Sequence, residues 1–216
     1  MSYIFPKKQL SEIDCIIFDL GGVIVDIDYQ RPIKEFSKLG FNNINEIYSQ
    51  CYQIELFDKF DKGLISPQEF REKLLINYSI SITPKEFNNA WNSIIIGIKE
   101  ETLNCIVKLK SKFKTLILSN TNLIHVDFMD KYLKHTYNIE NINYLVHNVH
   151  YSCKMGMRKP DKEIFETVLN TNNLVPHRTL FIDDTIVNIE SAKSLGFITY
   201  LMRKDDSIKE LFSEIL

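Results

Sequence analysis

Short apolar runs recur along the chain, and several of them end on a polar side chain. The first, Ile16-Ile17-Phe18, predicts a strand buried on both faces, and Asp19 ends it. Runs of the same kind predict further strands at residues 115–118, 144–146, 179–182 and 198–201. Helical patterns alternate with them, with apolar residues on one face at helical spacing and helices predicted at residues 123–132, 161–169, 186–195 and 208–216. Strands that alternate with helices indicate an α/β fold with a parallel sheet.

Residues 30–98 break this alternation because their pattern is helical throughout. Ser66-Pro67-Gln68-Glu69 and Thr83-Pro84-Lys85-Glu86 each join a capping box to a proline in the first helical turn. Apolar residues also recur at helical spacing over residues 44–56. An all-helical insertion after the first strand predicts a separate small bundle. The alternative is that these helices simply pack on the sheet.

Composition and charge narrow the class of protein. The chain has 216 residues, of which 44% are hydrophobic, and a formal net charge of -2. This is enough to bury a sizeable core, and it provides no overall basic field for nucleic acid or an anionic membrane. No signal peptide or membrane span is evident, so we expect a cytoplasmic enzyme, as a monomer or weak dimer. The four cysteines include no Cys-x-x-Cys, which argues against zinc, and Cys15 and Cys105 are predicted to be core residues.

Polar groups at strand ends are candidates for chemistry, because parallel sheets bind ligands at the carboxyl ends of their strands. Asp19 is followed by two glycines that permit a sharp turn and a close backbone approach. Later strands end at Ser119-Asn120 and at Asp183-Asp184, and Lys159 precedes a predicted helix start. Each has a simpler explanation: a turn hydroxyl, a surface lysine, or acids that cap a helix. Together they place a carboxylate, a hydroxyl, a lysine and an acidic pair in a fixed order.

That order resembles the haloacid dehalogenase-like superfamily, whose four motifs run Asp, Ser/Thr, Lys and acidic pair. The run from Phe18 to Tyr29 and the Ser-Asn-Thr-Asn at 119–122 are most similar to a branch of small bacterial phosphatases that includes glucose-1-phosphate phosphatases. The resemblance implies a Rossmann-like core, residues 1–29 and 99–216, with a mobile helical cap at residues 30–98. It also implies that a small phosphorylated metabolite is the substrate, with a sugar phosphate such as glucose 1-phosphate as one candidate.

The resemblance further implies roles for the motif residues. Asp19 would attack phosphorus and form a phospho-aspartate that water then hydrolyses. Mg²⁺ would be held by oxygen ligands, as it prefers, from Asp19, the Gly21 carbonyl, Asp184 and Asp183. Lys159 would pair with the nucleophile and with the transferring group. Phosphoryl oxygens would accept hydrogen bonds from the hydroxyl of Ser119 and the backbone N–H groups of Leu20 and Asn120.

One position departs from the usual pattern. Most phosphatases of this superfamily carry a second Asp two residues after the nucleophile, as the acid that protonates the leaving alcohol, and this chain has Gly21 there. Asp28, Asp26 or a water is left as a replacement, and Asp26 could instead fix a helix cap or linker. Since an anomeric phosphate needs little protonation, we expect a preference for anomeric over simple alkyl phosphates.

Several other residues are candidates for the site. His125 closely follows the second motif and could face the pocket, and Asn188 could steady the metal site. Arg158 is expected to be solvated, with a phosphate-facing role as the alternative. Tyr29, Arg31 and a turn at residues 57–62 are candidates for a substrate-facing wall.

Two other functions remain open. A 2-haloacid dehalogenase also uses an Asp nucleophile and also lacks the second Asp, but it works without a metal, whereas the pair Asp183-Asp184 favours one. A non-catalytic module that binds phosphorylated metabolites would explain Gly21 without requiring turnover.

Overall fold

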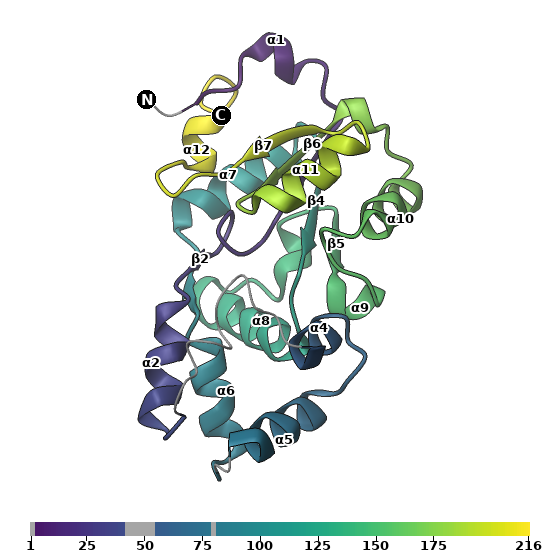
Figure 1. Ribbon diagram of the computed structural model, residues 1–216. Helices are drawn as coiled ribbons and strands as arrows, with labels where there is room; N and C mark the ends of the chain where they lie inside the picture. The colour runs from purple at the N-terminus through teal and green to yellow at the C-terminus, as the bar shows by residue number, and fades with distance from the viewer. Residues whose placement is uncertain (1–2, 42–54, 79–80) are drawn as a thin grey trace.

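The computed structural model describes residues 3–41, 55–78 and 81–216. Its main sheet has five parallel strands in the order β5-β4-β1-β6-β7 (Figure 1). The strands are β1 (Cys15–Phe18), β4 (Lys114–Ser119), β5 (Asn148–Tyr151), β6 (Thr179–Asp183) and β7 (Ile198–Leu201). The α/β fold with a parallel sheet is therefore confirmed.

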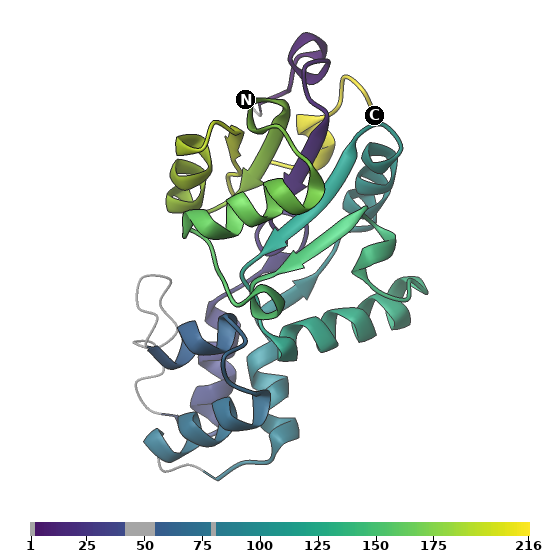
Figure 2. The same cartoon turned by 90° about the vertical axis from the view of Figure 1, so that its right-hand side faces the viewer.

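Helices cover both faces of this sheet, as Figure 2 shows from the side. One face carries α7 (Glu100–Lys110), α8 (Leu123–Tyr137) and α12 (Ile208–Leu211), and the other carries α10 (Lys162–Asn172) and α11 (Ile186–Ser194). The short elements are α1 (Lys7–Leu10), α9 (Ser152–Met155), η1 (Ile142–Tyr144) and η2 (Pro176–Arg178). Each face of the sheet thus has its own buried core.

The central strand β1 shows why the sheet needs two cores. Its side chains alternate, so that Ile16 and Phe18 join the α7–α8 side while Cys15 and Ile17 join the α10–α11 side. All four are fully buried. A continuous apolar run is what a strand covered on both faces requires. The prediction that Cys15 and Cys105 are core residues is confirmed, since both are buried.

The helical insertion leaves and rejoins the core through a two-stranded antiparallel ribbon, β2 (Asp26–Ile27) and β3 (Ile95–Gly97). The helices described between these strands form the lower part of the molecule in Figure 1. They are α2 (Gln30–Lys38), α4 (Glu55–Asp61), α5 (Pro67–Tyr78) and α6 (Pro84–Asn92). Both predicted capping boxes are present: the Ser66 and Thr83 hydroxyls each accept from a backbone N–H three residues on, and each glutamate reaches back.

The cap, meaning these four helices, has an aromatic core of its own. Phe60 stacks on Phe70 with ring centroids 4.0 Å apart, and Trp91 contacts both rings. The cluster also takes in Ile124 from α8, a helix of the α/β core. The neighbouring His125 stacks on Trp91, with the two ring centroids 5.5 Å apart. Cap and α/β core are therefore packed together through the first turn of α8.

Several expected elements differ from the structure. The strand predicted at residues 144–146 is wrong, because Leu145 and Val146 are buried in the turn after η1 and the strand begins at Asn148. The last helix is only α12, which is shorter than predicted. The ribbon β2–β3 was not predicted, because two or three residues are too few to show a period. The helix predicted over residues 44–56 lies almost entirely outside the described residues, and the domain boundaries at 30 and 98 stay a prediction.

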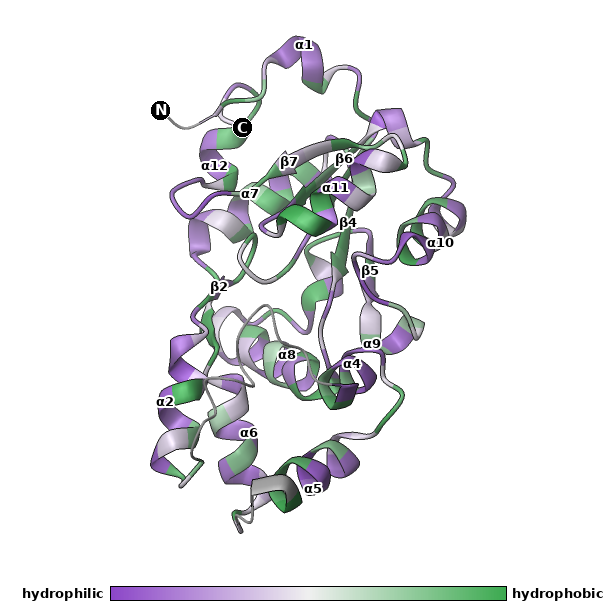
Figure 3. Cartoon of the chain, viewed as in Figure 1, coloured by the Kyte–Doolittle hydropathy of each residue, from purple (hydrophilic) through white to green (hydrophobic). Residues whose placement is uncertain are grey.

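Hydropathy follows this architecture in Figure 3, where the middle of β4 is hydrophobic and α1 is mostly hydrophilic. Among the residues that the structure describes, no helix combines the length and the apolar character needed to cross a bilayer.

Candidate active site

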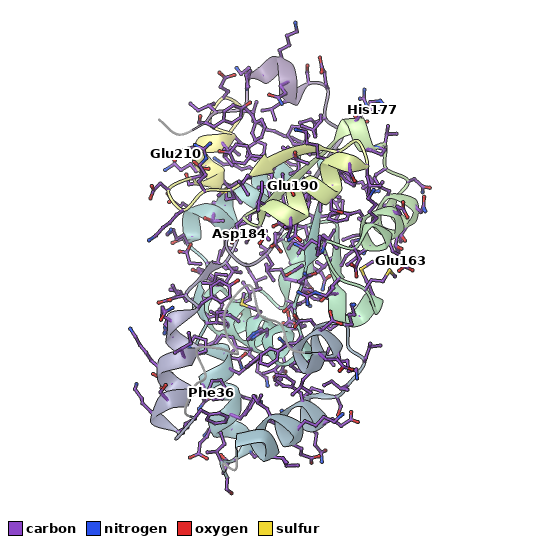
Figure 4. All side chains as sticks on the ribbon, in the orientation of Figure 1. Phe36, Glu163, His177, Asp184, Glu190 and Glu210 are labelled. Carbon is purple, nitrogen blue, oxygen red and sulfur yellow. The ribbon has the colours of Figure 1, made fainter. Side chains whose placement is uncertain are left out.

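The strand order brings three of the predicted residues to one edge of the sheet. β1 lies between β4 and β6, so Asp19 follows the central strand while Ser119 and Asp183 end its two neighbours. The Asp19 N–H donates to the Ile182 carbonyl at 2.8 Å, which continues the ladder to this edge. Figure 4 places Asp184 in the middle of the molecule, between the sheet and the cap.

Lys159 joins this cluster from a loop. Its Nζ lies 2.9 Å from Asp19 Oδ1 and 2.6 Å from Asp183 Oδ2, and its side chain has no exposed surface. Burial opposes the positive charge of Lys159, but Asp19 and Asp183 outweigh burial and raise its pKa. Lys159 is therefore a fixed cation beside the candidate nucleophile, as predicted.

Two asparagines hold this ion pair in place. The Asn120 side chain clamps the Lys159 peptide, donating to its carbonyl and accepting from its N–H, each at 2.8 Å. Asn188 donates to both oxygens of Asp183 at 3.0 and 3.1 Å, and the Thr185 N–H donates to the same carboxylate at 2.8 Å. The Asn120 clamp was not predicted, because nothing in the sequence shows that its side chain would meet residue 159.

The two glycines after Asp19 serve different purposes. Gly22 has φ +74°, and a Cβ there would lie 2.1 Å from Asp184 Oδ2, so a side chain would collide with the carboxylate. Gly21 lacks a positive φ, and a Cβ there would meet Ile27 at an ordinary 3.4 Å. The Leu20 N–H, predicted to reach a phosphoryl oxygen, donates to Asp19 Oδ1 at 2.7 Å in this structure.

The acids form a group that suits a divalent cation. Asp19, Asp183 and Asp184 each offer an oxygen, and these oxygens lie within 4.8 Å of one another. Three carboxylates face one ammonium, Lys159, which leaves an excess of negative charge in a largely buried place. Burial raises the pKa of Asp19 and of Asp184, with neighbouring carboxylates adding to the effect in both. Oxygen-only ligands of this charge fit Mg²⁺.

The cluster opens into a cavity of about 1060 Å³ between the α/β core and the cap. Asp19, Ser119 and Lys159 line it from the core. Of the candidates for the substrate-facing wall and pocket, those that line the cavity are Tyr29, Phe57, Asp58, Asp61, Lys62 and His125. Arg31 is exposed and is not among the lining residues that the structure describes. Residues 57–62 were predicted as a turn, but most of them form α4, whose buried Phe57 and Phe60 anchor it to the cap core.

Three further candidates have roles that the contacts define. Asp26 pairs with Lys99 at 3.1 Å, which joins the two connections to the cap, and Asp28 accepts from the Gln30 N–H at 2.8 Å at the start of α2. Neither appears among the described residues that line the cavity. The expectation that Arg158 is solvated is wrong: its side chain is only 16% exposed, because α4 packs over it and supplies Asp58 at 3.3 Å.

Comparison with known proteins agrees with this geometry. Residues 13–196 match the model of the haloacid dehalogenase-like hydrolase family, so the chain belongs to that family. It is 31% identical to a D-ribitol-5-phosphate phosphatase from Bacteroides thetaiotaomicron over 187 residues, which are 86% of this chain and 89% of the relative.

Solved structures show the same likeness. A haloacid dehalogenase family enzyme from Bacteroides thetaiotaomicron, in complex with magnesium and inorganic phosphate, superposes with a TM-score of 0.82 at 33% identity, covering 89% of this chain and 96% of that one. A haloacid dehalogenase-like hydrolase from Porphyromonas gingivalis superposes with a TM-score of 0.83 at 29% identity. This match covers 90% of this chain and 93% of that one. An L-2-haloacid dehalogenase gives 0.60 at 18% identity, covering 88% and 84%, and this shows a shared fold alone.

Proposed function

We propose that this protein is a Mg²⁺-dependent phosphatase that hydrolyses a small phosphorylated polyol or sugar through a phospho-aspartate on Asp19. The observation that carries the proposal is the convergence of Asp19, Lys159 and the acidic pair on one cavity. The phosphatase relative and the magnesium-containing structural relative support the same chemistry.

The proposed role of each residue follows from its charge and its hydrogen-bonding groups. Asp19 is the nucleophile, and Lys159 holds it in place and neutralises the phosphoryl group as charge builds up on it. Ser119, buried at the end of β4, and the Asn120 N–H donate hydrogen bonds to phosphoryl oxygens. Asp183 fixes Lys159, and Asn188 and Thr185 fix Asp183.

Asp19, Asp184 and the Gly21 carbonyl would hold Mg²⁺, with Asp183 completing the acidic cluster. The ion supplies positive charge that screens the attacking carboxylate from the phosphoryl oxygens. The alcohol part of the proposed substrate carries several further hydroxyl groups. This choice follows the phosphatase relative, which is named for D-ribitol 5-phosphate, a phosphorylated polyol.

The test is hydrolysis of p-nitrophenyl phosphate and of D-ribitol 5-phosphate, with Mg²⁺ and with EDTA. We expect turnover with Mg²⁺ only, and a phosphoryl adduct on the peptide that contains Asp19 when the reaction is quenched in acid. Asp19→Asn should lose both turnover and adduct. Asp26→Asn is the matched control, since it removes a nearby carboxylate that pairs with Lys99 outside the site.

Other results would redirect the assignment. Release of halide from a 2-haloacid in the presence of EDTA would indicate a dehalogenase. Phosphate binding with no turnover of either ester, in the wild type as in Asp19→Asn, would indicate a binding module.

A further inference from the structure

Cleavage of an alkyl phosphate leaves an alkoxide that needs a proton, and Gly21 has no side chain to supply one. The cavity contains other acids. Asp19 and Asp184 belong to the nucleophile and metal cluster. Asp58 and Asp161 are exposed by 36% and 59% and pair with Lys62. Asp61 is the remaining carboxylic acid among the described lining residues, and its side chain is only 16% exposed.

Backbone contacts hold the end of α4, and with it Asp61, against the loop that follows β4. The Ser152 hydroxyl donates to the Asp61 carbonyl at 2.6 Å and accepts from the Thr121 N–H at 2.9 Å. Thr121 is two residues after Ser119, so one side chain ties the end of α4 to the loop that follows β4. The backbone at Gly63 also packs directly against Cys153. A Cβ at Gly63 would lie 2.0 Å from the Cys153 carbonyl oxygen, so a side chain there would force these two segments apart.

The side chain of Asp61 has polar neighbours that orient it. Asn122 is hydrogen-bonded to its carboxyl group, and the Arg158 guanidinium lies at the outer limit of an ion pair, 4.0 Å away. Burial raises the pKa of Asp61 to about 6, and Arg158 opposes this only in part. A carboxylic acid with a pKa near the working pH is suited to general acid catalysis.

His125 is the other titratable candidate in the cavity, and its surroundings disqualify it. Its Nδ1 lies 2.9 Å from Asn92 Oδ1, and its ring stacks on Trp91. Burial lowers its pKa to about 3, so the imidazole stays neutral and has no acidic proton to transfer near neutral pH. It can bind a substrate hydroxyl, but it cannot replace the missing acid.

We infer that Asp61, carried by the cap, is the general acid that protonates the leaving alcohol. The inference rests on the proposed function and extends it to esters with poor leaving groups. In the first step an Asp19 oxygen bonds to phosphorus, the bond from phosphorus to the alcohol oxygen breaks with its electron pair, and the Asp61 proton moves to that oxygen. In the second step water attacks phosphorus, the Asp19–phosphorus bond breaks, the proton of the water leaves with the phosphate, and Asp61 regains its own proton from solvent.

The charged and titratable groups around Asp61 are few in the part of the chain that the structure describes. Arg158 and the Cys153 thiol face it from the α/β core, and Asp58 lies one turn earlier on α4. The nearby Arg158 favours the carboxylate, and Asp58 and burial favour the acid. The acid form is therefore lost as pH rises through about 6, and turnover of an alkyl phosphate should fall over the same range.

The experiment compares leaving groups in Asp61→Asn. Phenyl phosphate and p-nitrophenyl phosphate have nearly the same shape, but p-nitrophenol is the stronger acid and leaves with little protonation. We expect kcat for p-nitrophenyl phosphate to stay close to wild type. We expect kcat for phenyl phosphate to fall, and kcat for D-ribitol 5-phosphate to fall by about 100-fold or more, the usual worth of a general acid. The decline of ribitol phosphate turnover above pH 6 should disappear.

Controls separate this role from packing and from substrate binding. Asp161→Asn, which removes a more exposed carboxylic acid from the same cavity, should behave as wild type toward all three esters. Asp61→Glu, which keeps a carboxylic acid, should recover part of the lost kcat. Equal losses for all esters in Asp61→Asn, or a rise in KM with kcat unchanged, would overturn the inference. Failure of the wild type to hydrolyse p-nitrophenyl phosphate would instead refute the proposed function.

Discussion

The adjacent glycines Gly21 and Gly22 should respond in opposite ways to the same added methyl group. In Gly22→Ala the new Cβ would lie 2.1 Å from Asp184 Oδ2, and the residue would have to hold φ near +74°. The left-handed backbone alone costs an alanine about 1–2 kcal/mol. At about 2–4 °C per kcal/mol for a chain of this size, Tm should fall by about 2–8 °C. Displacement of Asp184 should lower Tm further.

Gly21→Ala is the matched control. Its Cβ would make an ordinary contact with Ile27, and its φ is not positive. A glycine replaced by alanine at such a position stabilises a protein by about 0.4–1 kcal/mol, because the unfolded chain loses freedom. Tm should therefore stay the same or rise.

The assay is thermal unfolding with and without Mg²⁺. An ion present at about 100 times its Kd adds about 2.7 kcal/mol to the free energy of unfolding, so the wild type and Gly21→Ala should both melt higher with Mg²⁺. Gly22→Ala should lose most of this increment, since Asp184 is pushed away. A full Mg²⁺ increment in Gly22→Ala, or equal destabilisation by the two substitutions, would refute the reasoning.

Three further outcomes follow from buried groups. Lys159→Met should lower the free energy of unfolding by about 3–5 kcal/mol in urea titrations without Mg²⁺, because Asp19 and Asp183 lose their cation, whereas the exposed Lys162→Met should not. Ser152→Ala should lower the free energy of unfolding by about 1–3 kcal/mol, because the Asp61 carbonyl and the Thr121 N–H lose their shared partner. Ser194→Ala is its control. An equal Tm for the two variants would contradict this role of Ser152. Burial lowers the pKa of His125 to about 3, so below pH 6.5 the unfolded chain binds more protons than the folded chain. The free energy of unfolding should therefore fall as pH drops, by at most about 1.4 kcal/mol per pH unit. His125→Phe should flatten that slope, and an unchanged slope would assign it to other groups.

The sequence predicted the parts of this molecule that depend on local pattern. The buried strand before Asp19, the strand before Asp183 and both capping boxes follow from residues close together in the chain. The meeting of Asp19, Lys159 and Asp183 could be inferred because parallel strands share one edge and because the motif order resembled a known family.

What the sequence did not predict depends on contacts across the boundary between core and cap. Asp61 and Arg158 carry no local signal, because their burial exists only once α4 packs on the loop that follows β4. Asn120 was expected to act through its backbone, and only the fold shows that its side chain clamps Lys159. The preference for anomeric phosphates that was inferred from Gly21 gives way, under the Asp61 inference, to an enzyme that also serves alkyl esters.

The first turn of α8 has a practical consequence for protein engineering. Ile124 completes the hydrophobic centre of the helical insertion, and the neighbouring Asn122 accepts a hydrogen bond from the Trp91 indole. A chimera that exchanges only the segment between β2 and β3 with that of a related hydrolase would leave these partners behind on the recipient. Grafts should therefore carry residues 122–125 with the insertion, and substrate preference should transfer only when both pieces move together.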